Sequence, residues 1–246
     1  MNLQEYKVMY ELEDSHWWYV GMRRIILSLI DSHHEGQNNL LVLDAGCGTG
    51  AMTRHLARYG KVIGSDISSE AIKFCTQRAL GRCELVQSSL AGLPFDDETF
   101  DLIASLDVIC VIEDDTLAFQ ELGRVLKTGG RLIVSLPAYE PLRSEHDLAV
   151  DIKRRYTKGR LKDRMERAGL NVERIAYANT LLLPVAVMLR IAKKWPNKAA
   201  SEAKSDLWPL PAILNRWLAD ILFLENRLLR HMDLPFGLSV FCLARK

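Results

Sequence analysis

The chain has 246 residues, a formal net charge of +1 and 48% hydrophobic residues. This length accommodates one α/β domain with an appended element, and the near-neutral charge gives no electrostatic reason to expect nucleic-acid binding. The five cysteines form no Cys-x-x-Cys pair, so we expect free thiols in the cytoplasm and no metal site. Acidic residues before residue 15 argue against a signal peptide, and no uncharged apolar run reaches the 18 residues of a membrane span.

The N-terminal segment predicts two helices with an aromatic cluster between them. Residues 3–14 suit a short polar helix, and Ser15 suits an N-cap for a helix that continues into apolar residues 25–30. The adjacent aromatics Trp17 to Tyr19 exceed what one helical face buries, because consecutive residues point about 100° apart. Two interpretations stay open: a lid fixed to the core by tryptophan, or a segment that closes over a ligand site.

A glycine turn follows the first predicted strand. Residues 41–50 spell Leu-Val-Leu-Asp-Ala-Gly-Cys-Gly-Thr-Gly, a short apolar run that ends in an acid and three alternating glycines. A helix is expected over 51–58, so the turn lies at the carboxyl end of a strand, where open α/β sheets bind ligands. The next strand, 61–66, ends in Asp66, which suits two ribose hydroxyls. The Gly-x-Gly-x-Gly spacing disfavours a dinucleotide site, which needs Gly-x-Gly-x-x-Gly.

Strands and helices then alternate, which predicts a parallel sheet with right-handed crossovers. Strands are expected at 40–45, 61–66, 83–87, 100–105 and 131–136, and helices near 51–58, 69–80 and 114–127. Thr128–Gly130 is expected to end the last of these helices with a left-handed cap. Two further strands, 171–177 and 238–245, should close the sheet as an antiparallel pair.

Strand, acid, alternating glycines, helix, second strand and second acid together resemble the class I S-adenosylmethionine-dependent methyltransferases. The His-Trp-Trp-aromatic opening with Arg23-Arg24 resembles a bacterial subgroup of that family. The resemblance implies a Rossmann-like α/β fold with a seven-stranded sheet, five parallel strands plus the C-terminal antiparallel pair, and helices on both faces. It also implies S-adenosyl-L-methionine as the cofactor and no metal.

The resemblance further implies which residues hold the cofactor. Trp18 and an arginine, Arg23, should lie near the site, the arginine pairing with the methionyl carboxylate. Ile67 should lie against the adenine, and Ser89 stands where relatives carry aspartate, so it offers a weaker neutral acceptor. The implied contacts are Asp44, Ala45, Gly46, Gly48, Gly50, Asp66, Ile67, Ser89, Leu90, Leu106, Trp18 and Arg23.

Segments after the fourth and fifth strands carry the candidate chemistry. Cys110-Val111 stands where many relatives have Glu-His, and Asp107 is either functional or an acid favoured by a helix N-terminus. Loop 137–157 resembles the subgroup's Ser-x-His-Asp … His-x-Arg-Arg-Tyr-Thr, with Ile152 in place of the second histidine. His146 is our candidate general base, with hydrogen bonding to nearby backbone as the alternative and His16 as second choice. Acceptor contacts are expected from Trp17, Tyr139 and Tyr156.

An insertion at 178–236 precedes the last strand. It predicts two apolar helices, 180–195 and 211–232, joined by a polar linker at 196–206 that we expect to be disordered. The first helix is too short and too charged to span a bilayer. It could pack on the core, cover an apolar acceptor pocket or form a dimer face, or rest on a membrane surface.

The resulting domain plan has three parts. We expect an N-terminal helical cap at 1–36, a methyltransferase domain at 37–177 and 237–246, and the helical insertion at 178–236. The predicted function is methyl transfer to a small or lipid-like apolar acceptor, at oxygen in preference to nitrogen or carbon. The alternative is a non-catalytic cofactor-binding or assembly module that keeps the fold. A homodimer and a peripheral membrane contact both stay open.

Overall fold

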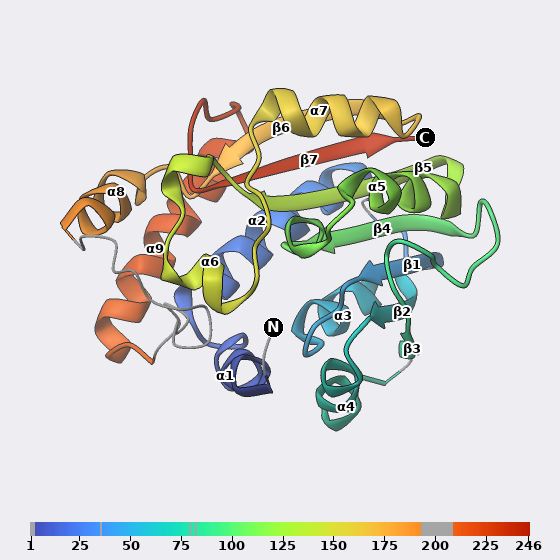
Figure 1. Ribbon diagram of the computed structural model, residues 1–246, viewed down its shortest axis with the longest axis horizontal. Helices are drawn as coiled ribbons and strands as arrows, with labels where there is room; N and C mark the ends of the chain where they lie inside the picture. The colour runs from blue at the N-terminus through green and yellow to red at the C-terminus, as the bar shows by residue number, and fades with distance from the viewer. Residues whose placement is uncertain (1–2, 35, 79, 82, 193–208) are drawn as a thin grey trace.

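The protein is described here by a computed structural model that covers residues 3–34, 36–78, 80–81, 83–192 and 209–246. Its centre is one seven-stranded sheet in the order β3-β2-β1-β4-β5-β7-β6 (Figure 1). The strands are β1 Leu40–Ala45, β2 Gly60–Asp66, β3 Cys83–Gln87, β4 Phe100–Leu106, β5 Leu126–Pro137, β6 Asn171–Ala178 and β7 Ser239–Arg245. The predicted seven-stranded Rossmann-like fold is confirmed.

The order of the strands in the sheet reverses at β1. Neighbouring pairs among β1 to β5 are parallel, whereas β7 runs antiparallel to both β5 and β6. Asp44 on β1 is in register with Gly64 of β2 on one side and Ala104 of β4 on the other. The chain therefore winds outward from β1 in both directions, and the carboxyl ends of β1 and β4 flank the crevice where such sheets bind ligands.

Helices cover both faces of the sheet. They are α1 Leu3–Leu12, α2 Trp17–His34, α3 Ala51–Leu56, α4 Ser69–Gln77, α5 Asp115–Val125, α6 Glu145–Ala149, α7 Lys158–Arg167, α8 Leu183–Ala192 and α9 Ala212–Leu229. Short 3₁₀ turns lie at Ala57–Tyr59, Ile109–Val111 and Glu140–Leu142. Helices α5 and α7 pack in one apolar core against one face, while α2, α3 and α9 contribute to a second core on the other.

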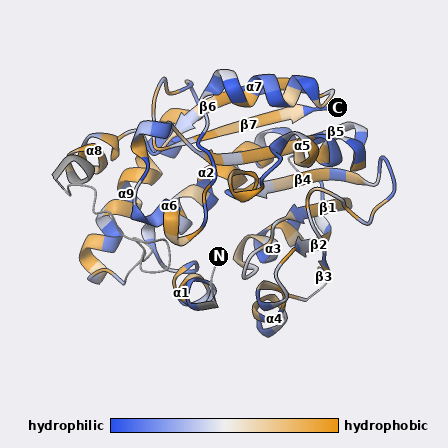
Figure 2. Ribbon diagram, viewed as in Figure 1, coloured by the Kyte–Doolittle hydropathy of each residue, from blue (hydrophilic) through white to orange (hydrophobic). Residues whose placement is uncertain are grey.

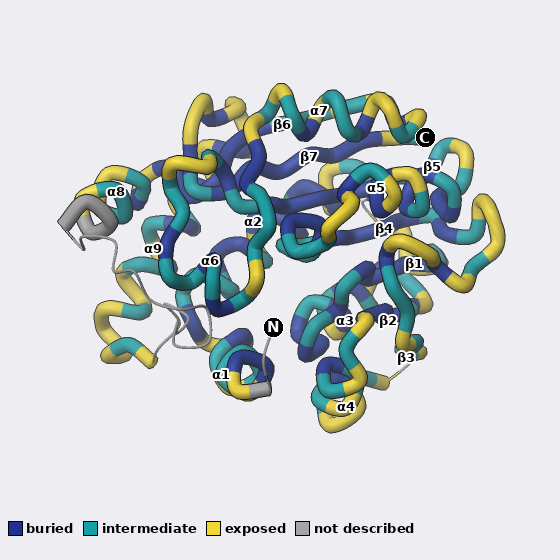
Figure 3. The backbone as a smooth tube through the Cα atoms, in the orientation of Figure 1, coloured by how far each residue is buried: buried dark blue, intermediate teal, exposed yellow. Residues whose placement is uncertain are grey.

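The central strands are apolar because both of their faces are covered. Strands β5 and β7 are buried along most of their length (Figure 3). Hydrophobic colour follows β7, whereas α7 is mostly hydrophilic and exposes that polar surface (Figure 2). Thr157 caps α7, its Oγ1 accepting a hydrogen bond from the Arg160 amide at 3.3 Å.

Two details of the predicted elements are wrong. Helix α5 ends at Val125, and β5 begins at Leu126, so Thr128–Gly130 lies inside a strand instead of capping a helix. Gly129 keeps a left-handed φ of +85°, and its amide donates to the Lys246 carbonyl at 2.9 Å. Ser15 stands one residue too early for a cap, because α2 begins at Trp17.

The insertion forms two described helices, and the second packs along α2 (Figure 1). The predicted linker at 196–206 lies outside the described residues, as does the expected end of α8. No described helix is long and apolar enough to cross a membrane. The five cysteines are free, and the described part of the chain holds no group of three or more metal-ligating side chains.

Candidate functional site

The glycine turn after β1 adopts a backbone that other residues rarely accept. Gly46, Gly48 and Gly50 have φ values of +85°, +55° and +91°. The amides of Gly46 and Cys47 both donate to the Ser65 carbonyl, at 2.7 and 2.9 Å, which ties the turn to β2. A Cβ on Gly46 would lie 2.2 Å from a Val108 methyl group. Both the left-handed backbone and the close approach therefore require glycine here.

The two acids that end β1 and β2 are buried and face different partners. Asp44 accepts from the Thr53 hydroxyl at 2.6 Å, so its carboxyl fastens the strand to α3. Burial raises the pKa of Asp44 to about 7, the Thr53 hydrogen bond opposes this, and the negative charges of Glu13 and Asp66 reinforce it. Ala45 beside it is fully buried in the strand.

Asp66 connects the glycine turn with the start of α4. Its carboxylate accepts from the Gly48 amide at 3.0 Å and from the Ser68 amide at 2.9 Å. Burial raises its pKa, and hydrogen bonds from the backbone amides partly counter that rise. The next side chain, Ile67, is 68% exposed although it is apolar. An acid at the strand end followed by an exposed aliphatic surface is the arrangement expected for a ribose and an adenine face.

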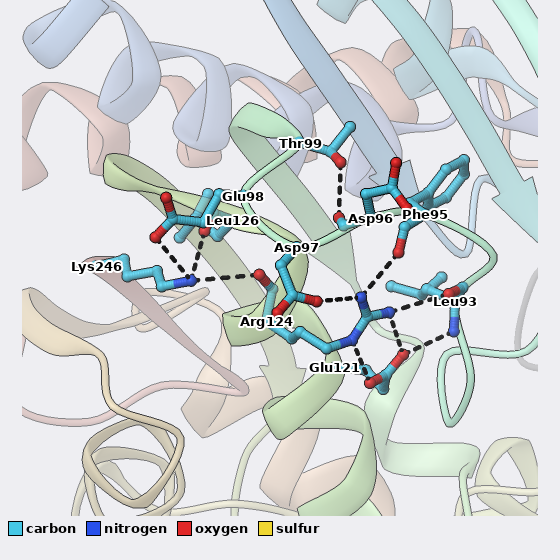
Figure 4. A network of polar contacts seen from close by, with 10 residues as sticks. All are labelled: Leu93, Phe95, Asp96, Asp97, Glu98, Thr99, Glu121, Arg124, Leu126 and Lys246. Atoms are coloured by element: carbon cyan, nitrogen blue, oxygen red, sulfur yellow. Dashed lines mark hydrogen bonds and ion pairs between the residues drawn. The ribbon is translucent and has the colours of Figure 1, made fainter.

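The segment after β3, which we expect to meet the adenine edge, is held in place by side chains of α5. Ser89 accepts from the Ala91 amide at 3.2 Å, and Leu90 is buried. Figure 4 shows the brace that holds the residues following them: the Arg124 guanidinium donates to the Leu93 carbonyl at 3.0 Å and to Glu121. The Glu121 carboxylate in turn accepts from the Leu93 amide at 2.9 Å. The brace fixes the conformation of this loop from α5.

Helix α1 lies over the glycine turn and is attached to it by a buried ion pair. Arg78 Nη2 lies 2.6 Å from Glu13 Oε1, with both side chains less than a tenth exposed. Arg78 Nε also donates to the Thr49 carbonyl at 2.6 Å, and the Thr49 hydroxyl donates to Glu13. The Met9 methyl group would lie 2.7 Å from a Cβ on Gly48. This contact could not be predicted from the sequence, because Glu13 and Arg78 belong to no motif.

A second group surrounds the end of β4, where the sequence had singled out Asp107 but not Tyr19. Asp107 has a φ of +59°, and its amide donates to the Ser135 carbonyl at 2.8 Å. Burial raises the pKa of Asp107 to about 7, against the opposing charge of Arg155. Burial together with the negative charges of Glu13, Asp107 and Glu5 raises the pKa of Tyr19. Helix α2 therefore presents a neutral phenol to a group of carboxyls, an environment that favours a cationic ligand.

The aromatic residues at the start of α2 are held by a contact with α9. The Trp17 amide donates to the Asn215 side-chain oxygen on α9 at 2.8 Å. Trp18 is partly buried and meets Tyr19 edge-on at 5.0 Å between ring centroids. Arg23 donates to the Glu13 carbonyl at 2.9 Å. The segment thus connects α1 with α9, while Leu106 at the end of β4 packs beneath it.

The loop after β5 carries His146 on the short helix α6, next to a buried ion pair. Asp147 accepts two 2.6 Å hydrogen bonds from the Arg155 guanidinium, which also donates to the Ala138 carbonyl at 2.9 Å. The His146 side chain is half-buried. The positive charge of Arg155 opposes the rise in the pKa of Asp107 that burial causes. The ion pair therefore lies close enough to the end of β4 to act on Asp107 electrostatically.

The structure bears on two of the expected acceptor contacts, Tyr156 and Tyr139: the expected contact at Tyr156 is wrong, and Tyr139 is held by a neighbouring ring. Tyr156 is fully buried, and its hydroxyl donates to the buried carboxylate of Asp115 at 2.7 Å. A side chain enclosed in the core in this way has no surface left for a substrate. Tyr139 is half-buried and stacks on Tyr177 at 5.0 Å.

The fold and the glycine turn define the class first: a Rossmann-like methyltransferase fold. A methyltransferase from Haloferax volcanii, solved with the Trm112 methyltransferase activator, superposes with a TM-score of 0.62 at 20% identity, covering 99% of this chain and 93% of that one. The [4+2]-cyclase SpnF superposes with a TM-score of 0.59 at 18% identity over 90% and 80% of the two chains. Likeness at this level establishes the fold alone.

The sequence matches a family model over part of its length. Residues 43–134 match the model of the methyltransferase domain. The chain is similar to the ubiquinone/menaquinone biosynthesis C-methyltransferases UbiE of Cronobacter sakazakii and Escherichia coli. Each is 36% identical over 118 residues, which is 43% of this chain and 47% of the relative. The chain thus spans about half the length of these curated relatives. The cofactor of the family is S-adenosyl-L-methionine.

Proposed function

We propose that this chain transfers the methyl group of S-adenosyl-L-methionine to a hydroxyl group of a small or lipid-like apolar acceptor. The observation that carries the proposal is the set of carboxyls around the glycine turn, the buried Asp44 and Asp66 and the half-buried Asp107, beside the exposed Ile67. S-adenosyl-L-methionine carries a sulfonium and an ammonium group against one carboxylate. Carboxyls in a low-dielectric setting favour such a cation over its neutral product.

The residues of the chain fit the cofactor in the following way. Asp66 would accept from the ribose hydroxyls, and Ile67 would cover one face of the adenine. The Leu90 amide and the Ser89 hydroxyl would meet the adenine edge. Arg124 and Glu121 hold the loop that carries these two residues through hydrogen bonds to the Leu93 backbone. When bound, the cofactor supplies an electrophilic methyl group. The protein contributes alignment, which can account for much of the rate.

His146 remains our candidate for the base that takes the proton from the acceptor hydroxyl. An imidazole titrates near neutrality, so it can accept a proton at physiological pH. The neighbouring Asp147–Arg155 ion pair anchors α6. His16 is the second choice: burial lowers its pKa, which keeps the imidazole neutral and able to accept a proton.

The acceptor atom that receives the methyl group could be oxygen or carbon, and the name of the relatives is relevant to this choice. The UbiE proteins are named as C-methyltransferases, and deprotonating a phenol activates its ring carbon as well as its oxygen. The family model ends at residue 134, before His146 and before the helical insertion. The parts of the chain that would meet an acceptor therefore lie outside the matched domain, and we retain oxygen as the proposed site.

A lipid-like acceptor is supported by the apolar surface of the insertion. Val185 and Met188 on α8 are exposed, as are Ile213 and Trp217 at the start of α9. Exposed apolar side chains on both helices of the insertion favour contact with an apolar partner. The same surface would serve the peripheral membrane contact or the homodimer that the sequence left open.

The experiment supplies methyl-labelled S-adenosyl-L-methionine and fractionated bacterial lipid and phenolic extracts, and follows label into organic products. Label in a methyl ether is expected, and label on a ring carbon would replace oxygen with carbon. His146→Ala should slow turnover by about 10²-fold, with the exposed His231 changed to Ala as the matched control. Full activity of His146→Ala would assign the base elsewhere. Cofactor binding without label transfer to any fraction would favour the non-catalytic module.

A further inference from the structure

An open cavity of about 350 Å³ lies between α2, the 3₁₀ turn Ala57–Tyr59 and α9, and it is lined by residues of these three segments together with Arg230, which follows α9. Among the described residues that line it are four arginines, Arg23, Arg24, Arg58 and Arg230, and one carboxylate, Asp31. These five side chains give a formal charge of +3 in a chain whose net charge is +1. Arg24 and Arg230 are exposed at the open side of this cavity. Like charges gathered in one place repel one another, so the arrangement favours a bound anion.

Asp31 is already engaged within this cavity. Its two carboxylate oxygens accept from Arg58 Nη2 at 2.7 and 2.8 Å, and one of them also accepts from the Tyr59 hydroxyl at 2.7 Å. The single acid therefore neutralises Arg58 in particular. The positive charge contributed by Arg24 and Arg230 is left for another anion.

Arg24 and Arg230 are oriented by contacts that leave donors available. The Arg24 guanidinium carbon lies 4.2 Å from the centroid of the Phe223 ring, a stacked position that occupies its face and spares its N–H edge. Arg230 uses Nε to donate to the Ser28 hydroxyl at 3.2 Å, which leaves its two terminal nitrogens. Planar guanidinium groups held in this way match the paired oxygens of a phosphate.

The volume of the cavity and its other lining residues favour a ligand larger than a single inorganic ion. A water molecule takes about 30 Å³ of liquid volume. A cavity of about 350 Å³ therefore has room for more than the five heavy atoms of an isolated phosphate. Val20, Leu27 and Phe223 add apolar surface next to the arginines. A ligand with a phosphate or diphosphate group and an organic part would satisfy both kinds of lining.

We propose that the cavity between α2 and α9 binds an organic phosphate, with Arg24 and Arg230 holding its phosphoryl oxygens. This site is separate from the glycine turn, and it does not depend on the proposed methyl transfer. The same chemistry could come from a soluble metabolite or from the headgroup of an anionic phospholipid, so the test has one arm for each source.

The soluble arm titrates the full chain with inorganic pyrophosphate by calorimetry and follows its melting temperature. Wild-type protein should bind and melt higher, and binding should weaken as salt is raised. Arg24→Gln and Arg230→Gln should each weaken binding by about tenfold or more, because each removes hydrogen bonds to a charged group. Arg227→Gln is the matched control, since Arg227 is an exposed arginine on α9 that does not line the cavity.

The lipid arm measures co-sedimentation with phosphatidylcholine vesicles that contain or lack phosphatidic acid. Binding that needs phosphatidic acid and both cavity arginines, with little response to pyrophosphate, assigns the site to a lipid headgroup. Pyrophosphate binding without vesicle binding assigns it to a soluble ligand. Unchanged circular dichroism and unchanged S-adenosylhomocysteine binding show that the variants are folded. Equal losses in Arg227→Gln, or no anion binding in either arm, would overturn the proposal.

Discussion

Cofactor binding should be coupled to proton release, because two carboxyls at the site titrate near neutrality. Burial raises the pKa of Asp44 and of Asp107 to about 7. At pH 7 each of them is therefore about half protonated before the cofactor binds. A cationic ligand stabilises the ionised carboxylate and lowers its pKa, so binding S-adenosyl-L-methionine should expel up to about one proton in total.

The same shifts fix the sign of the pH dependence of stability. An acid whose folded pKa is raised favours the protonated form in the fold. Its contribution to stability is complete below the unfolded pKa near 3.8 and is lost as pH rises through about 7. For Asp44, which is almost fully buried, ionisation is about 4 kcal/mol less favourable in the fold than in the unfolded chain. Asp44→Asn should therefore stabilise the free protein by up to about 4 kcal/mol at pH 8 and have little effect at pH 4.

The assay is calorimetric titration at pH 7 in PIPES and in imidazole, whose ionisation enthalpies differ. The observed binding enthalpy of S-adenosyl-L-methionine should differ between the two buffers by the number of protons released multiplied by the difference between their ionisation enthalpies. S-adenosylhomocysteine lacks the sulfonium charge and should release fewer protons. The double variant Asp44→Asn, Asp107→Asn should show no buffer dependence. Equal enthalpies in both buffers for the wild-type chain would refute the assignment of these carboxyls to the cationic site.

Three further perturbations test other parts of the site. Asp66→Ala should weaken cofactor binding by about 1.5–3 kcal/mol, measured by calorimetry, whereas the exposed Asp96 changed to Ala should bind normally. Arg78→Ala leaves the buried Glu13 carboxylate without its ion pair and should destabilise the fold by about 3–5 kcal/mol; an unchanged denaturation midpoint would show that α1 is not held through this pair. Gly46→Ala meets a valine side chain at 2.2 Å and a disfavoured backbone, so a variant that still binds the cofactor as wild type would contradict the geometry of the turn.

The sequence predicted the cofactor half of the fold accurately because its signals are local. Strand, glycine turn and helix follow one another within 41–58, and short-range hydrophobic pattern and turn chemistry suffice to place them. The ends of β1 and β3 match their expected residues. The misplaced cap at Thr128–Gly130 has the same origin: a left-handed glycine is compatible with a helix end and with an irregular strand, and pairing with β4 and β7 decides between them.

The parts that the sequence did not predict depend on residues far apart in the chain. Glu13 and Arg78 are distant in sequence, yet they fasten α1 over the glycine turn. Tyr156 lies in a loop rich in functional-looking residues, but its hydroxyl is committed to Asp115, 41 positions away. Neither pairing follows from spacing or composition, since each is created only when the sheet brings the segments together.

The contact between α2 and α9 extends this reasoning to the acceptor. Trp17 and Asn215 are 198 positions apart, and their hydrogen bond brings the start of α2 against the insertion. The Asn215 amide also donates to the Ser15 carbonyl at 2.8 Å, so the aromatic opening and α9 are fastened at two points. A change in α9 would therefore alter the position of Trp17, Trp18 and Tyr19. The matched domain contains the glycine turn, whereas this contact between α2 and α9 positions Trp17, which we propose as an acceptor contact. Asn215→Ala should consequently raise the KM for an acceptor more than it weakens cofactor binding, and an equal effect on both would place α9 at the cofactor itself.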